Sequence, residues 1–385
     1  MHSIIDQRSL LASLASGAPS PQRNPRRRLA VYLPALVGGG AERVAAVLAS
    51  NLSEAGHDVT LVTDFDAPHN EKFVDAGVDR VTLAGAHGRD VLRLAGFIKE
   101  AQPEIVLAIG AATNIKLVLA HMLARLTSRV RTRLVLSYHG SSDCGTGRLG
   151  WSGYPLAALL TRYAHRTVCV SDELVDHLVR KWKADRRQVV RIYNPIATDR
   201  AKPVAAAEAL AVRPPIILTL GRLCAQKDYP TLIRAFAMLR RADARLAICG
   251  EGPDRPGLEL LARQLGVADR IDWCGYIHEP WSAYETARCF VSSSRSESFG
   301  NVVVEALASG LPVVATACGG PSEILGGGRY GRLVPIGDAE ALSLAIAETL
   351  DQPGDPAPRM ARAREFSAPR ITNRYIAMFE EVLSS

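Results

Sequence analysis

The stretch SRSESFGNVVVE, residues 294–305, decides which fold we expect for this chain. It follows an apolar run, residues 289–291, that predicts a buried strand, and it leads into residues 302–308, which predict a helix. Glu297 therefore belongs to a strand-to-helix loop and Glu305 to the second turn of the helix. In an open α/β sheet such a loop lies at the carboxyl edge of the strands, where ligands bind.

The same stretch indicates the kind of ligand. A helix start offers free N–H groups and the positive end of the helix dipole to an anion. The two flanking acids, Glu297 and Glu305, indicate a ligand with hydroxyl groups on both sides of a phosphate. Each acid taken alone is more often a solvated surface residue, so the other motifs of the chain must decide.

Length and composition predict a two-domain globular protein. A single core usually stops growing well before 385 residues, and 48% hydrophobic with 22% charged residues is ordinary for a soluble chain. The richest apolar runs, residues 105–112 and 117–126, are too short to span a bilayer, which takes about 20 residues, so we expect no integral membrane segment. The seven cysteines form no C-x-x-C pair, which favours buried thiols in a reduced, cytosolic chain over disulfides or a zinc site.

The net charge of +7 is concentrated in the first half of the chain. No acid occurs between Glu104 and Asp143. Such a face suits anionic lipid head groups, a phosphorylated substrate or nucleic acid, although basic residues also make ordinary solvated faces. Aromatic residues are 6% of the chain and no nucleic-acid motif accompanies the basic residues, so nucleic acid ranks last. The basic residues of this segment are Lys116, Arg125, Arg129, Arg131 and Arg133.

The chain opens with a basic leader, residues 1–28, that we expect to be mobile and that lacks the pattern of a signal peptide. A strand (29–33), three glycines (38–40), a helix (41–55) and a second strand (59–62) follow, as in parallel nucleotide-binding folds. The loop is neither G-x-G-x-x-G nor a P-loop, so a dinucleotide or a Walker-type ATP site is not expected. Its glycines either let a ligand approach the backbone or form a tight turn.

Strand and helix patterns alternate through the rest of the first half. One predicted strand, residues 133–137, runs into Tyr138-His139-Gly140 at a carboxyl edge. His139 can accept a hydrogen bond or a proton there near neutral pH, but a single histidine is more often structural. Ser171 is expected to cap the helix that follows the strand at residues 167–170.

A polar linker with several prolines, residues 196–215, separates the two halves. The second half restarts with a strand that ends in a Gly221-Arg222 loop, with Lys227 just beyond. We therefore expect two doubly wound, Rossmann-like α/β domains that face each other across a cleft. Their predicted limits are 29–195 and 216–370, and a C-terminal helix, 371–385, is expected to pack back on the first domain.

Four motifs lie in order at strand ends of the second half: Gly221-Arg222-Leu223 with Lys227, Gly250-Glu251-Gly252-Pro253, Glu297-Ser298-Phe299-Gly300 with Glu305, and Cys318-Gly319-Gly320-Pro321. Together they resemble the retaining family-4 glycosyltransferases, which have the GT-B fold. The resemblance covers roughly residues 29–380 and is strongest from 216 to 340. Gly38-Gly39-Gly40-Ala41-Glu42-Arg43 in the first half is similar to bacterial members that build glycans on lipid carriers or surface polysaccharides.

The resemblance implies a role for residues of both halves. Arg222 and Lys227 hold the donor diphosphate, for which a planar fork and a point charge are well suited. Glu305 takes the ribose hydroxyls, Glu297 lies beside the transferred sugar, and His139 sits next to the reacting sugar. Lys227, Arg222, Glu297 and His139 are therefore the catalytic candidates. Further donor-binding candidates are Gly39, Gly40, Gly221, Glu251, Phe299, Gly300 and Asn301.

The resemblance also implies how the reaction runs. No D-x-D motif stands in a sugar-binding context, so we expect no metal and no tightly bound cofactor, with Arg222 and Lys227 neutralising the diphosphate instead. The family is usually discussed as reacting on one face of an oxocarbenium-like sugar, while the leaving phosphate helps to deprotonate the acceptor. Whether Glu297 attacks as a nucleophile or only positions the sugar stays open.

The overall expectation is a cytosolic glycosyltransferase, peripheral on the inner face of the cytoplasmic membrane. It would move a hexose or N-acetylhexosamine from a UDP sugar to a lipid-linked or polysaccharide acceptor. A GDP-mannose-dependent mannosyltransferase of the same fold is the alternative donor class. A GT-B epimerase or phosphorylase and a catalytically silent sugar-nucleotide-binding protein are the other classes, and the presence of all the charged site residues argues against the silent one.

Overall fold

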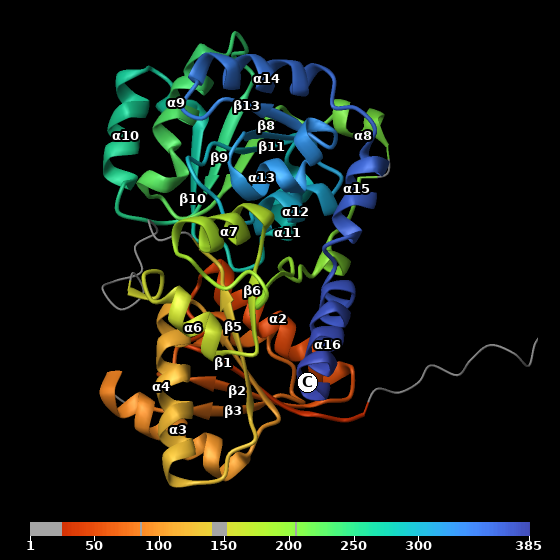
Figure 1. Ribbon diagram of the computed structural model, residues 1–385. Coiled ribbons are helices and arrows are strands. Elements are labelled where there is room, and N and C mark those ends of the chain that lie inside the picture. The colour runs from red at the N-terminus through yellow and green to blue at the C-terminus, as the bar shows by residue number, and fades with distance from the viewer. Residues whose placement is uncertain (1–24, 85–86, 141–151, 205) are drawn as a thin grey trace, which may run out of the picture.

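The chain folds into two α/β domains stacked one on the other (Figure 1). The computed structural model describes residues 25–84, 87–140, 152–204 and 206–385, so most of the predicted leader lies outside the described residues. Each domain is built on one open, all-parallel sheet. The predicted architecture of two doubly wound domains is confirmed.

The first domain has a seven-stranded sheet of order β3-β2-β1-β4-β5-β6-β7. Its strands are β1 (Arg28–Leu33), β2 (Asp58–Thr63), β3 (Asp79–Thr82), β4 (Ile105–Ile109), β5 (Arg133–Tyr138), β6 (Arg166–Cys169) and β7 (Val189–Arg191). Its helices are α2 (Gly40–Glu54), α3 (His87–Ala101), α4 (Ala111–Thr127), α6 (Ala157–Tyr163) and α7 (Asp172–Asp176), and a short π-helical segment, His177–Lys181, continues α7.

The second domain has a six-stranded sheet of order β10-β9-β8-β11-β12-β13. Its strands are β8 (Ile216–Leu220), β9 (Arg245–Cys249), β10 (Ile271–Gly275), β11 (Cys289–Ser292), β12 (Val313–Thr316) and β13 (Arg332–Val334). Its helices are α8 (Ala207–Ala211), α9 (Tyr229–Met238), α10 (Arg255–Gln264), α11 (Trp281–Thr286), α12 (Asn301–Ala308), α13 (Gly319–Ile324), α14 (Ala339–Asp351) and α15 (Pro356–Arg364).

The apolar strands of the first domain are buried on both faces. In β1, Leu29 and Val31 belong to one hydrophobic core and Ala30 and Tyr32 to another, because successive side chains point to opposite faces of the sheet. The strand order reverses direction between β1 and β4, and again between β8 and β11 in the second domain. Both reversals place the loops after these strands in the crevice where such folds bind ligands.

The chain crosses between the domains twice, and the two crossings lie side by side. The backbone N–H of Ile196 donates to Phe366 O at 2.9 Å, and that of Ala368 donates back to Ile196 O at 2.8 Å. The last helix, α16 (Ala368–Ser384), then runs down along the first domain and packs against α2 (Figure 1). Glu380 on this helix accepts a 2.6 Å hydrogen bond from Arg27, which ties the C-terminal helix to the start of β1.

One basic residue of the first half, Lys116, does not lie on the surface where we expected it. Lys116 is only 5% exposed and pairs with Asp64 at 2.5 Å and Asp90 at 3.0 Å inside the first domain. Assigning Lys116 to a basic surface was therefore wrong, because acids from distant segments enclose it. Arg125, Arg129 and Arg131 are exposed as expected. No helix within the described ranges is both long and apolar enough to cross a membrane.

Candidate active site

Glu297 and Lys227 form an ion pair in the second domain, and Glu297 also lines a pocket that both domains share. Glu297 belongs to the loop between β11 and α12, and Lys227 ends a 3-10 turn (Ala225–Lys227) just after β8. Both side chains are 19% exposed. Burial by itself would lower the pKa of Lys227, but the charge of Glu297 and its hydrogen bond outweigh burial, so the pKa lies above its ordinary value. The lysine is therefore a cation at neutral pH.

The start of α12 joins three segments of the chain. Gly300 caps the helix in the left-handed region, with φ of +102°, which favours glycine at this position. Asn301 follows it, and its Oδ1 accepts a 2.8 Å hydrogen bond from Asn194 Nδ2. Its own Nδ2 donates to Gly40 O in the first domain at 3.3 Å. The ring of Phe299 packs against Tyr193 and Phe366, so only its backbone is placed to serve a ligand.

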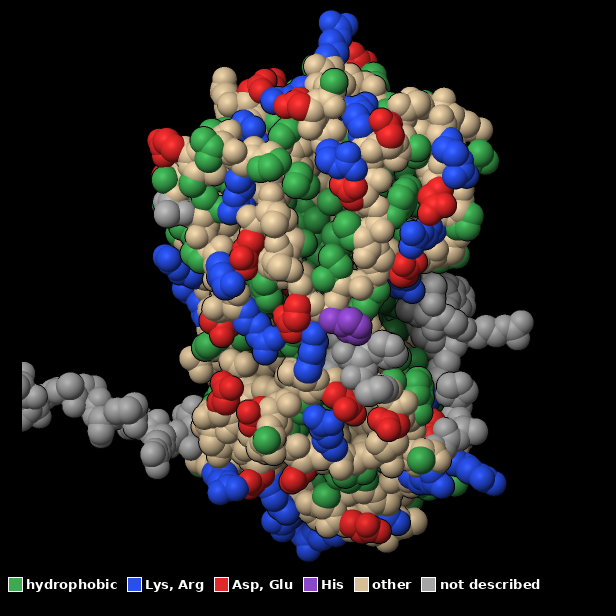
Figure 2. All heavy atoms as spheres, turned by 180° about the vertical axis from the view of Figure 1, so that it is seen from behind, with side chains coloured by type: hydrophobic (Ala, Val, Ile, Leu, Met, Phe, Trp, Pro, Cys, Tyr) green, Lys and Arg blue, Asp and Glu red, His purple; other side chains and the backbone are tan. Residues whose placement is uncertain are grey.

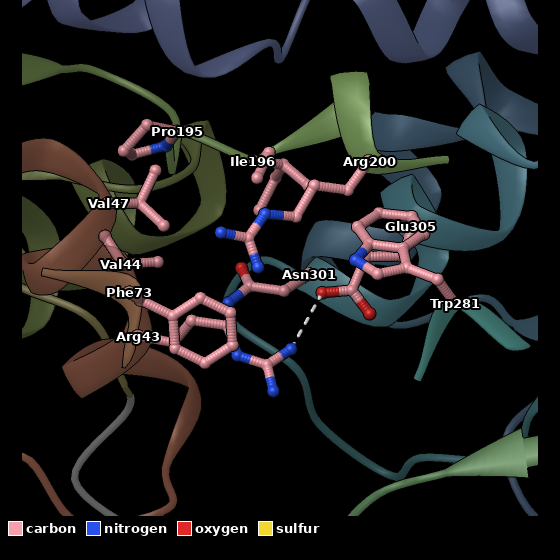
Figure 3. Close-up of a pocket in the computed structure, with 11 residues that line it drawn as sticks. Arg43, Val44, Val47, Phe73, Pro195, Ile196, Arg200, Trp281, Asn301 and Glu305 are labelled. Carbon is pink, nitrogen blue, oxygen red and sulfur yellow. Dashed lines mark hydrogen bonds and ion pairs between the residues drawn. The ribbon is translucent and has the colours of Figure 1, made fainter. Parts of the chain in front are cut away.

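Glu305 lies deeper in the cleft and is 3% exposed. Its Oε2 accepts a 2.9 Å hydrogen bond from Tyr284 Oη, and its Oε1 lies 3.4 Å from Nη1 of Arg43 on α2 (Figure 3). Burial, followed by the charge of Glu305, raises the pKa of Tyr284 well above its ordinary value. The phenol therefore keeps its proton and donates a hydrogen bond to this carboxylate. The ion pair with Arg43 links the two domains.

The glycine-rich loop of the first domain lies directly against the second domain. A Cβ atom on Gly38 would come within 2.7 Å of Tyr276 Oη, and one on Gly40 within 3.3 Å of Asn301 Nδ2. A side chain on Gly39 would collide with the carboxylate of Glu42. The contacts of Gly38 and Gly40 show that the two domains approach closely here, beside the start of α12.

His139 lies where β5 ends, as its place in the sequence predicts. Its Nε2 lies 3.0 Å from Ser137 Oγ, and its Nδ1 is buried without a hydrogen-bond partner among the residues that the structure describes. Burial lowers the pKa of His139 to about 4. The imidazole is therefore neutral at pH 7 and can act there as a hydrogen-bonding group rather than as a cation.

Three further candidates follow β8 and β9. Arg222 is exposed and lies close enough to Glu42 for its charge to act on that carboxyl. Burial raises the pKa of Glu42, and the charge of Arg222 offsets part of this increase. Gly221 packs so tightly on the next loop that a side chain on Gly250 would overlap its carbonyl oxygen. Glu251 is exposed and pairs with Arg255 of α10 at 2.8 Å. Glu251 thus has a partner in its own domain, whereas Arg222 faces the first domain.

Several residues at the cleft were not predicted from the sequence. A pocket beside Glu297 is also lined by Glu173 and His177, which follow the Ser171 cap of α7. Burial, then the charge of Glu323, raises the pKa of Glu173. Glu173 follows a predicted strand and cap, so its place at a carboxyl edge was available as a signal. Arg43 stood in a quoted motif, but no local pattern indicated that it reaches Glu305.

Comparisons with known proteins now decide the family. The model described as "Glycosyltransferase Family 4" matches residues 38–200, and the model described as "Glycosyl transferases group 1" matches residues 203–366. The chain belongs to the family-4 glycosyltransferases. The expected family and fold are therefore confirmed.

Two curated relatives align with most of this glycosyltransferase. The lipopolysaccharide core biosynthesis glycosyltransferase LpsE of Rhizobium meliloti is 27% identical over 80% of this chain and 85% of its own. The N-acetylgalactosamine-N,N'-diacetylbacillosaminyl-diphospho-undecaprenol 4-alpha-N-acetylgalactosaminyltransferase of Campylobacter jejuni is 24% identical over 84% of this chain and 90% of its own. Both alignments include each of the two domains.

Among solved structures, HepE of Anabaena in complex with UDP and glucose has a similar fold. Its TM-score is 0.77 at 17% identity, with 92% of this glycosyltransferase and 100% of that chain covered. At this identity the similarity concerns the fold only. Within the described part of this chain, no group of three or more His, Cys, Asp or Glu side chains is arranged to hold a metal ion.

Proposed function

We propose that this glycosyltransferase moves a hexose or N-acetylhexosamine from a UDP sugar to a lipid-linked or polysaccharide acceptor, with retention of anomeric configuration. The observation that carries the proposal is the half-buried Lys227–Glu297 pair beside the start of α12. It sets a fixed cation, helix N–H groups and a carboxylate at one point, which suits a sugar joined to a diphosphate. The Anabaena neighbour is in complex with UDP and glucose, and the Campylobacter relative is named for a diphospho-undecaprenol substrate.

In the proposed reaction the second domain binds the donor. Lys227 and Arg222 neutralise the diphosphate as it leaves, so that the chain needs no divalent metal for this purpose. Glu305 accepts hydrogen bonds from the ribose hydroxyls, and Glu297 from the hydroxyls of the sugar. The neutral His139 faces the sugar from the first domain. The glycines at 38–40 leave room where the domains meet.

The acceptor is proposed to approach from the first domain. The pocket that Glu297 shares with Glu173 and His177 has side chains from both domains. A carboxylate and an imidazole in one pocket match the hydroxyl groups of a glycan. Charged side chains of both signs gather around the waist between the domains (Figure 2).

A screen of UDP and GDP sugars by thermal shift tests the donor. A sugar nucleotide at a hundred times its Kd raises the free energy of unfolding by about 2.7 kcal/mol, hence Tm by about 5 °C. We expect such a rise with a UDP sugar and a smaller one in the Lys227→Ala variant. A rise with GDP-mannose alone would replace the donor class. No rise with any sugar nucleotide would contradict the proposal.

We further propose that the first domain docks on an anionic membrane through α4 and α6, which pack together. The exposed side of α4 carries Leu119, Met122 and Leu126, the last 83% exposed, and α6 adds Leu159, 67% exposed. Arg125 is exposed on α4, and the exposed Arg129 and Arg131 follow the end of this helix. Exposed apolar side chains together with arginines suit a surface with anionic head groups above an apolar layer.

Liposome co-sedimentation tests the docking. Replacing Arg125, Arg129 and Arg131 by glutamate is expected to abolish binding to vesicles that contain anionic lipid, because each basic residue near such a surface contributes about 1 kcal/mol. The matched control reverses three arginines of the second domain, Arg234, Arg240 and Arg263, and should bind like the wild type. Equal binding by both triple variants would show that arginines 125, 129 and 131 are only solvated.

A further inference from the structure

We propose that Arg43 is a positioning residue: it orients the carboxylate of Glu305 for the donor ribose and so couples donor binding to contact between the domains. The inference rests on the proposed function, in which Glu305 binds the ribose. Arg43 projects from the first turn of α2, and Figure 3 shows it pointing across the pocket to Glu305 on α12. The ribose anchor of one domain is thus held by the other.

The hydrogen bonds of Glu305 leave room for a ligand. A carboxylate has about four acceptor positions, two on each oxygen. Arg43 takes one on Oε1, at 3.4 Å, and Tyr284 takes one on Oε2, at 2.9 Å. One position on each oxygen is left, and two parallel acceptors suit the adjacent hydroxyl groups of a ribose. With both oxygens held, the carboxylate cannot rotate away from that geometry.

Arg43 is held in place by packing against an aromatic ring as well as by its ion pair. Its guanidinium lies 4.7 Å from the ring centroid of Phe73, and the side chain is 22% exposed. A long side chain that already stacks on an aromatic face is partly ordered, so it loses less conformational entropy when it makes an ion pair. Arg200 stacks on the same ring at 5.2 Å, but its ion pair is with Glu279. Arg200 is therefore a matched control in the same pocket.

The neighbouring residue extends the same pattern. Glu42 precedes Arg43 in the first turn of α2. Burial raises the pKa of the Glu42 carboxyl, and the positive charge of Arg222 offsets part of this increase. Two consecutive residues of the first domain thus face opposite charges of the second domain, at the two positions proposed for the diphosphate and the ribose. A donor that binds there contacts Arg222 and Glu305, the residues that face Glu42 and Arg43. Donor binding and the approach of the domains therefore depend on each other.

Calorimetric titration of UDP and 2′,3′-dideoxy-UDP into the full chain tests the inference, with GDP and its dideoxy analogue run beside them. The wild type should bind the ribose form about tenfold more tightly or better, because hydrogen bonds to a carboxylate are lost with the hydroxyls. Arg43→Gln should bind both forms with nearly equal affinity. Arg43→Lys should recover part of the preference, and Arg200→Gln should keep all of it.

The outcomes separate the inference from the proposed function. An Arg43→Gln protein that keeps the wild-type preference for the ribose form overturns the inference alone. If it binds both forms more weakly by the same factor, Arg43 has only a structural role, which also overturns the inference. A wild type that binds none of the four nucleotides overturns the proposed function, and the inference with it. The melting temperature of each variant shows that it is folded.

Discussion

Replacing Lys227 with alanine is expected to lower kcat for sugar transfer about a hundred- to a thousandfold, the usual effect of removing one charge-stabilising group from an active site. Lys227 pairs with Glu297, just before α12, and its backbone carbonyl accepts a 2.8 Å hydrogen bond from Ser293 Oγ. A side chain on Gly221 would touch it at 3.3 Å, so the lysine is closely packed. Steady-state kinetics with the donor found by the thermal-shift screen provide the measurement.

The fold of this variant should persist. The lost ion pair is partly exposed and lies in a cleft, not in a core, so Tm should fall by no more than about 5 °C. Lys202→Ala removes another lysine that pairs with a glutamate, Glu285, on the surface, and it should leave kcat unchanged. Turnover of the Lys227 variant within threefold of the wild type would contradict its assignment to the diphosphate.

The sequence was sufficient where one strand or helix is specified by its own residues. β1 and β2 lie within one residue of the limits that their apolar runs, residues 29–33 and 59–62, predict, because a parallel strand buried on both faces reads as an uninterrupted apolar segment. Ser171 caps α7 as expected, with its Oγ accepting from Leu174 N at 3.2 Å. The acids of the 294–305 stretch stand at a carboxyl edge for the same reason: strand and helix signals on either side locate the loop.

The sequence was insufficient where a feature depends on distant segments. Arg43 and Glu305 are 262 positions apart, and nothing local to either one indicates the other. Lys116 looked like a surface cation until the fold enclosed it with Asp64 and Asp90. The five-residue helix α8 lies within the predicted linker, since so short a helix has too few residues to show a period. Each case requires the tertiary arrangement.

The cleft combines these two kinds of information. The loops after β8 and β11 supply Lys227 and Glu297. Glu297 was a candidate from its place at a strand end, and Lys227 became one through the family resemblance. The first domain adds Glu173, whose place after the Ser171 cap was a usable signal, and Arg43, whose contact with Glu305 requires the tertiary arrangement. In this interpretation the second domain binds the donor through residues of local sequence motifs. The first domain completes the site through contacts between distant segments, such as Arg43 with Glu305, which no local motif predicts.

Replacing Glu297 with alanine is expected to reduce transfer about a thousandfold, since it removes both the hydrogen bonds to the sugar and the partner that orients Lys227. Glu297→Gln then distinguishes its two possible roles. A glutamine can still donate and accept hydrogen bonds, so a positioning residue should keep about a tenth to a hundredth of the activity. A nucleophile needs the carboxylate itself, and the glutamine variant would then be as inactive as the alanine variant.

Mass spectrometry of the protein mixed with donor alone completes the test of Glu297. A nucleophilic Glu297 forms a covalent bond to the sugar, which would add the mass of one sugar residue to the wild type and not to Glu297→Gln. We expect no such adduct, because Glu297 already pairs with Lys227 and so stands beside the diphosphate that must leave. Glu340→Gln, on the outer helix α14, is the matched control and should behave as the wild type. An adduct on Glu297 would replace positioning with double displacement.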